Sequence, residues 1–141
     1  MSSNKDGIRY IVKPAEGVVI GICKCYTRNL CPEGLNEFEF RVFWDALLYS
    51  PRLWHYRQWF EIKAIARCNM EEDVFDEEFG KKLVEARIEK KKHEAALKIM
   101  RVFTEEMTDI MDKLTKSYNE HLNKERRIEI DLINYFGLEG V

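Results

Sequence analysis

The chain has 141 residues, of which 45% are hydrophobic and 12% aromatic, a composition typical of a folded protein rather than a disordered one. Its 23 basic and 25 acidic side chains give a formal net charge of −2, so no overall attraction to nucleic acid or to an anionic membrane is expected. No apolar stretch approaches the ~20 residues that cross a bilayer, and the N-terminus lacks the apolar segment of a signal peptide. We therefore expect a cytoplasmic protein with no membrane partner, and the charge balance disfavours a nucleic-acid partner, for which Lys90, Lys91 and Lys92 are the alternative contact.

The N-terminal part of the chain predicts a β-hairpin. Residues 8–12 and 18–25 are β-rich and are separated by the sequence KPAEG. Pro14 fixes its own φ and Gly17 can adopt a positive φ, as a hairpin connection requires. Gly21, in the middle of the second strand, indicates a bulge or a close approach of another backbone.

Aromatic residues dominate the next segment, and they predict a short helix over residues 35–48. Pro51 marks the end of this helix, because the residue before a proline disfavours the helical conformation. The sequence RLWHYRQWF follows and is more typical of a core or an oligomer interface than of a stacking platform for bases. The spacing of three and four residues that predicts the helix is set by Phe40, Phe43, Trp44 and Leu47.

Residues 61–68 predict a third strand, with small and apolar side chains on one face. An acidic turn over residues 69–74 follows, and Asp76 is a good N-cap for a helix that starts there. Glu77 and Glu78 would then lie in the first helical turn, where carboxylates favour the positive end of the helix dipole. Stabilisation of the helix start therefore explains the presence of these acids, and no catalytic role is needed to explain them.

Residues 76–123 predict one or two long helices, because glycine and proline are absent between Gly80 and Gly137. The charged sequence IEKKKHE is either a solvated stretch or a break between two helices. Residues 124–141 form a tail that could be a strand or a docking helix. A heptad seam, which predicts self-association through this C-terminal helix, consists of Ala96, Met100, Phe103, Met107, Ile110 and Leu114.

Together these elements predict a single α+β domain over residues 1–141. Its β-rich part, residues 1–75, is a small antiparallel sheet with one aromatic-rich helix. The helical part covers residues 76–123, and the tail covers residues 124–141.

No motif for catalysis or metal binding is recognised in the chain. The spacing of Cys23, Cys25, Cys31 and Cys68 favours buried free thiols over a zinc site, and the three histidines are scattered. Nucleophile elbows, zinc-protease motifs and phosphate-binding glycine loops are absent. We therefore expect no enzymatic activity, no metal and no cofactor.

The hairpin IRYIVKPAEGVVIGICK and the later sequence AIARCNMEEDVFDEEFGKKLVEAR resemble a family of small phage and prophage accessory proteins. That family carries a hairpin, a strand ending in Ala-Lys-Cys, an acidic turn, and Phe-Asp before a helix. Here Arg67 replaces the usual lysine, Met70 replaces a proline, and the turn is one residue longer. The positions that match are Ala66, Cys68, Glu72, Asp73, Phe75, Asp76, Gly80, Lys82 and Leu83.

This resemblance implies a protein that acts in the host cytoplasm against host defence. Some such proteins look similar to the Thoeris anti-defence sponges, which hold a cyclic ADP-ribose signal between protomers without chemistry. The leading hypothesis is therefore an oligomeric protein that sequesters a nucleotide-type immune signal. A pocket for such a ligand needs cations for phosphate, an aromatic or apolar wall for the base, and amide or acid groups for ribose. The residues assigned to these contacts are Arg28, Arg67, Asn69, Phe75, Phe79 and Arg87.

A second hypothesis is an inhibitor module that binds a host defence protein directly. The tryptophan, tyrosine and arginine residues of RLWHYRQWF are the types that dominate interface hot spots, and the helix seam offers a further contact surface.

Overall fold

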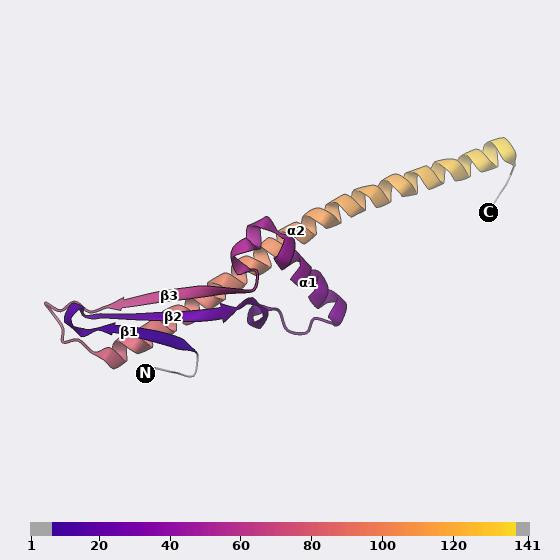
Figure 1. Ribbon diagram of the computed structural model, residues 1–141. Coiled ribbons are helices and arrows are strands. Elements are labelled where there is room, and N and C mark those ends of the chain that lie inside the picture. Colours follow the sequence, from indigo (N-terminus) through magenta and orange to yellow (C-terminus); the bar gives the residue numbers. More distant parts are fainter. Residues whose placement is uncertain (1–6, 138–141) are drawn as a thin grey trace. The chain divides into compact units, whose positions relative to one another are not determined.

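The computed structural model describes residues 7–137, and it has an α+β fold. Three strands, β1 (Ile8–Lys13), β2 (Val18–Tyr26) and β3 (Trp59–Arg67), form an antiparallel sheet in the order β1-β2-β3 (Figure 1). The contacts divide the chain into two compact units, one ending at Phe103 and one starting at Thr104, and each is described by itself. The prediction of one domain stays a prediction.

The hairpin between β1 and β2 is closed as its sequence indicates. A short 3-10 turn, η1 (Pro14–Glu16), is followed by Gly17 at φ 67°, and the Gly17 amide donates to the Pro14 carbonyl. Because this φ favours glycine, the prediction of a positive φ at this position is confirmed.

The first helix, α1 (Glu37–Tyr49), starts two residues later than expected because Asn36 caps it. The Asn36 side chain accepts from the Glu39 amide while the Glu39 carboxylate accepts from the Asn36 amide, a reciprocal capping box. The helix ends before Pro51, as predicted, and a 3-10 segment, η3 (Pro51–Tyr56), leads to β3.

One continuous helix, α2 (Glu77–Phe136), accounts for the C-terminal part of the described chain. The alternative of two helices is therefore excluded, and the charged sequence IEKKKHE lies inside the helix. The tail expected from residue 124 belongs to this same helix up to Phe136. The predicted boundary after residue 123 therefore does not coincide with the end of a helix. Residues 138–141 lie outside the described residues.

The first half of α2 covers one face of the sheet, and glycines allow it to approach closely (Figure 1). A Cβ on Gly21 of β2 would lie 2.2 Å from Val84 Cγ1, and a Cβ on Gly80 of α2 would lie 2.7 Å from Val19 Cγ2. At Gly21 the atoms nearest to an added Cβ belong to the side chains of Val84, Ile8 and Ile88, so the glycine makes room for side chains and not for another backbone.

Two adjoining groups of buried side chains form the core of the first unit. One lies between the sheet and α2, and includes Ile8, Val19, Phe60, Ile62, Val84 and Ile88. The other lies between α1, η3 and α2, and includes Phe43, Leu47, Leu53, Ile99 and Val102.

The stripe of α2 that is buried within the first unit differs from the predicted heptad seam, whose self-association stays a prediction. Ala96, Met100, Phe103 and Met107 are only half-buried, whereas Ile110 and Leu114 are exposed. The face of α2 that packs is set by the close contacts at Gly21 and Gly80, which no spacing within the helix encodes. The buried positions of the helix are Gly80, Val84, Ile88, Ala95, Ile99 and Val102.

Candidate functional site

The turn between β3 and α2 is held by backbone and side-chain hydrogen bonds centred on Asn69. The amides of Glu72 and Asp73 both donate to the Asn69 carbonyl, at 3.1 and 2.9 Å, and the Glu71 amide donates to Asn69 Oδ1 at 3.2 Å. One residue earlier, the Cys68 amide donates to the Gly17 carbonyl at 2.7 Å. The acidic turn is therefore tied to the sheet and folds back over its end.

Asp76 caps the start of α2, as its sequence position predicts. Its Oδ1 accepts from the Phe79 amide at 3.1 Å, and its carbonyl accepts from the Gly80 amide at 3.0 Å. The Asp76 carboxylate thus satisfies one of the free amides at the helix start and places a negative charge there, which disfavours an incoming anion.

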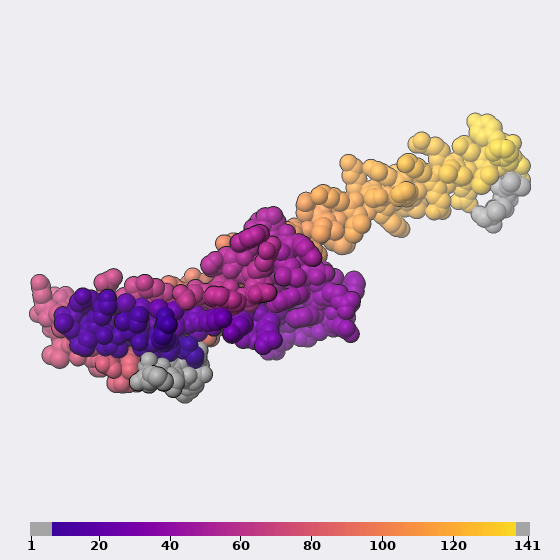
Figure 2. Space-filling view, viewed as in Figure 1, coloured from indigo at the N-terminus to yellow at the C-terminus, as the bar shows by residue number. Residues whose placement is uncertain are grey.

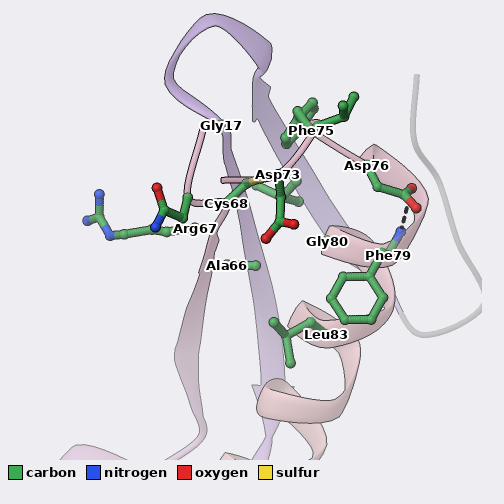
Figure 3. Close-up of a pocket in the computed structure, with 13 residues that line it drawn as sticks. Gly17, Ala66, Arg67, Cys68, Asp73, Phe75, Asp76, Phe79, Gly80 and Leu83 are labelled. Atoms are coloured by element: carbon green, nitrogen blue, oxygen red, sulfur yellow. Dashed lines mark hydrogen bonds between the residues drawn. The ribbon is translucent and has the colours of Figure 1, made fainter. Parts of the chain in front are cut away.

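A pocket of about 360 Å³ lies between the end of the sheet, the acidic turn and the first turns of α2 (Figure 3). This volume falls at the small end of the range for ligand pockets in proteins. Apolar side chains and glycines make most of its wall, and its polar residues come from the strand end and the turn. The lining residues are Gly17, Val19, Ala66, Arg67, Cys68, Asn69, Asp73, Val74, Phe75, Asp76, Phe79, Gly80 and Leu83.

Four of the six residues predicted from the sequence lie together in this pocket: Arg67, Asn69, Phe75 and Phe79. Phe79 is 64% exposed, so its side chain is accessible to a ligand. The Arg67 side chain extends away from α2, at the rim (Figure 3). Phosphate could therefore reach Arg67 only from outside the pocket.

Arg28 lies far from this pocket. It is in η2 (Thr27–Leu30), which follows the end of β2 at Tyr26, whereas Arg67 pairs with Val18 at the start of β2. The eight residue steps from Val18 to Tyr26 span roughly 26 Å at about 3.3 Å per residue. The structure thus separates two arginines that the sequence prediction had grouped.

Arg87 is also outside the pocket, on the exposed side of α2. Its guanidinium donates to the carbonyl of Ile65, and Lys91, one turn further on, donates to the carbonyl of Lys63. β3 is an edge strand, so these two cations cover carbonyls that would otherwise be open to another chain. A structural role explains Arg87 without a ligand.

Asp73 is one of the pocket residues that the sequence prediction of the site missed, and it is the one with a carboxylate directed into the pocket. Its carboxylate points into the space between β3 and the first turns of α2 (Figure 3). The sequence matched Asp73 to the family turn, but its orientation depends on how the turn folds back on Asn69. A carboxylate here accepts hydrogen bonds from hydroxyl or amino groups and repels phosphate, so it favours the nucleoside part of a ligand.

The cysteines are free thiols and lie apart from the pocket, except for Cys68 at its edge. Cys23 and Cys25 are buried on the α2 side of β2, on the same face, as alternation predicts. Burial raises the pKa of the Cys25 thiol, and also that of Cys31. Within residues 7–137, no three His, Cys, Asp or Glu residues are placed to hold a metal ion.

A search of the helices in the described chain finds none with the length and apolar character needed to cross a membrane. Comparison with protein-family models, with curated proteins and with solved structures gave no match to this chain.

Proposed function

We propose that the protein is a non-enzymatic, phage-derived anti-defence protein that oligomerises and sequesters a nucleotide-type immune signal, such as a cyclic ADP-ribose. The observation that carries the proposal is the pocket at the β3–α2 turn. Arg67, Asn69, Phe75 and Phe79 were assigned to a ligand from the sequence, and all four line one cavity of about 360 Å³.

The chemistry of the pocket suits a nucleoside with its phosphates at the rim. Phe79 and Leu83 offer an apolar wall for a base, and Asp73 can accept from ribose hydroxyls. Asn69 Oδ1 accepts from the Glu71 amide, and the NH2 group of its side-chain amide can donate to a ligand. Arg67 extends outward, where it can pair with a phosphate that stays near solvent (Figure 3).

The phage origin and the anti-defence role rest on the resemblance of the hairpin and of the β3–α2 turn to the phage accessory family. The turn keeps the strand–turn–helix arrangement despite Met70, whose side chain lies over Gly17, within 2.8 Å of the position of an added Cβ.

Replacing Arg67 with alanine is expected to weaken nucleotide binding about tenfold or more, because a charge-assisted contact to phosphate is lost. Arg28→Ala is the matched control, since it removes the same charge from the opposite end of the sheet. Native mass spectrometry and calorimetry with cyclic ADP-ribose would measure both. Released ligand should have an unchanged mass.

Equal losses for both arginine variants would indicate non-specific attraction and contradict the pocket assignment. Phe79→Ala provides a second check that does not alter charge. If wild-type protein takes up no nucleotide, the sponge proposal fails.

Oligomerisation through the C-terminal helix is supported by the exposed apolar residues of its distal part. Ile110, Met111, Leu114 and Tyr118 are all exposed in α2 beyond Thr104. Helices with an uncovered apolar stripe commonly pack on another helix.

Leu114→Glu is expected to reduce the oligomer mass measured by light scattering, because it places a charge in this stripe. Leu97→Glu is the control: Leu97 is 68% exposed on the same helix, but lies in the first unit. An unchanged mass for Leu114→Glu, or an equal loss for both variants, would contradict an interface at this position.

The alternative function is an inhibitor that binds a host defence protein through its aromatic and helical surface. Exposed aromatics on α1 and η3 favour it: Tyr49 and Trp54 are largely exposed, and the Arg57 guanidinium lies 3.9 Å from the Trp54 ring centroid. Tryptophan, tyrosine and arginine are the typical anchors of interfaces. Trp54→Ala should abolish capture of the host protein if this alternative holds, and leave nucleotide binding unchanged.

A further inference from the structure

The face of the sheet that α2 does not cover carries an excess of positive charge. Side chains alternate along each strand, so the residues between the buried ones point to this open face, which is seen in front of α2 in Figure 2. Five of them are exposed cations and one is an acid, Glu61, in a chain whose net charge is −2. The cations are Arg9, Lys13, Lys24, Lys63 and Arg67.

Among the described strand residues one carboxylate shares this face with the cations: Glu61, which lies directly opposite Lys24. The ion pairs found among residues 7–137 join neighbours along α1 and α2, and none includes a cation of the open face. Their charge therefore faces solvent and is available to an anionic partner.

The strand register places four of the five cations in two rows, one on each side of β2. Lys13 and Arg67 flank Val18, and Arg9 and Lys63 flank Ile22. Each pair spans two strand spacings, about 10 Å, and the two pairs are about 13 Å apart along the strands. Isoleucines fill the space between the pairs, where Ile11, Ile20 and Ile65 are in register.

An aromatic pair closes one end of this face. Tyr26 and Trp59 are directly opposite each other on β2 and β3, and they are 44% and 47% exposed. Lys24 Nζ lies 4.2 Å from the Trp59 ring centroid and 5.3 Å from that of Tyr26. A cation beside open aromatic rings is the combination that binds a phosphate and stacks an adjacent base.

We infer that the open face of the sheet binds single-stranded nucleic acid. The two rows of cations can contact phosphates on both sides of a nucleic-acid strand. The isoleucines between the rows can pack against sugars and bases, and Trp59 with Tyr26 can stack on a terminal base. A face three strands wide, about 10 Å between its outer strands, accommodates one strand rather than a duplex.

This site is separate from the proposed nucleotide pocket, although Arg67 lies at the boundary of both. Lys63 and Trp59 belong to the open face and do not line the pocket, whereas Asp73 and Phe79 line the pocket and are not on the open face. Variants at these positions therefore test the two proposals independently.

The test is fluorescence anisotropy with a labelled oligothymidylate of about 20 nucleotides, at about 50 mM salt and in a salt titration. Lys63→Glu is expected to weaken binding about tenfold or more and to lower the salt slope. Lys116→Glu, an exposed cation of α2 outside the sheet, is the matched control and should stay within about twofold.

Trp59→Ala should also weaken binding, and Trp59→Phe should restore most of it because a stacking ring remains. Circular dichroism of each variant would show that it is folded. The inference is overturned if the oligonucleotide does not bind, or if Lys63→Glu and Lys116→Glu are equally affected. It is also overturned if polyglutamate binds as tightly and Trp59→Ala has no effect, since the face would then recognise acidic protein.

Discussion

Replacing Leu47 with alanine is expected to lower the free energy of unfolding by about 2–5 kcal/mol, as is typical for a buried leucine truncated to alanine. Leu47 is 0% exposed and belongs to the buried group that joins α1 and η3 to α2. Its loss would leave a cavity beside Leu53, Ile99 and Val102, which are themselves almost fully buried. Urea unfolding followed by circular dichroism measures the change.

Leu97→Ala is the control for this experiment, because it removes the same atoms from an exposed position of α2. Its effect should stay within about 0.5 kcal/mol. A loss at Leu47 no larger than at Leu97 would contradict the packing of α1 on α2.

Replacing Gly21 with alanine is expected to lower the free energy of unfolding by about 1–3 kcal/mol, the usual cost of overpacking a well-packed core. The new methyl group would lie 2.2 Å from Val84 Cγ1, with Ile8 and Ile88 also close, at 3.1 and 3.2 Å. Val84 is fully buried between α2 and β2, so it cannot turn away without displacing its neighbours.

A double-mutant cycle with Val84→Ala separates this clash from other effects. Val84→Ala alone creates a cavity and is destabilising, but it removes the methyl group that the new Cβ would meet. The double variant should therefore be more stable than the sum of the single changes predicts, by about 1 kcal/mol or more. Strict additivity would contradict the close approach of α2 to Gly21.

Four of the six residues predicted for the candidate site lie together in the pocket, and two do not. Arg67, Asn69, Phe75 and Phe79 are close in the sequence, and a single strand–turn–helix brings them to one pocket. Arg28 was expected to join them, but it follows the opposite end of β2. The position of a residue from another segment depends on strand direction and register, which the local pattern did not supply.

The positive charge of the open face could not be predicted from the sequence either, because it also depends on strand register. Sequence inspection finds runs of like charge, such as Lys90, Lys91 and Lys92, and the overall balance of −2 argues against an anionic partner. The cations of the open face are single residues on three strands, far apart in the chain. Only the pairing of β1 with β2 and of β2 with β3 places them together.

The sequence by itself predicted the three strands, the first helix and the start of the second, but not where the second helix ends. Alternation predicted the three strands, Gly17 the hairpin connection, Pro51 the end of α1, and Asp76 the start of α2; the structure confirms each. These signals are local, because they arise from side-chain period, from restricted φ angles and from capping hydrogen bonds within a few residues.

The tertiary structure alone decided which face of the sheet α2 covers, which stripe of α2 is buried, and which polar residues share a pocket. Val84 meets Gly21 and Gly80 meets Val19 across more than sixty residues of sequence, and these contacts fix which stripe of the helix packs on the sheet. Packing of this kind depends on shape complementarity between distant segments. The local periodicity of either segment does not contain it.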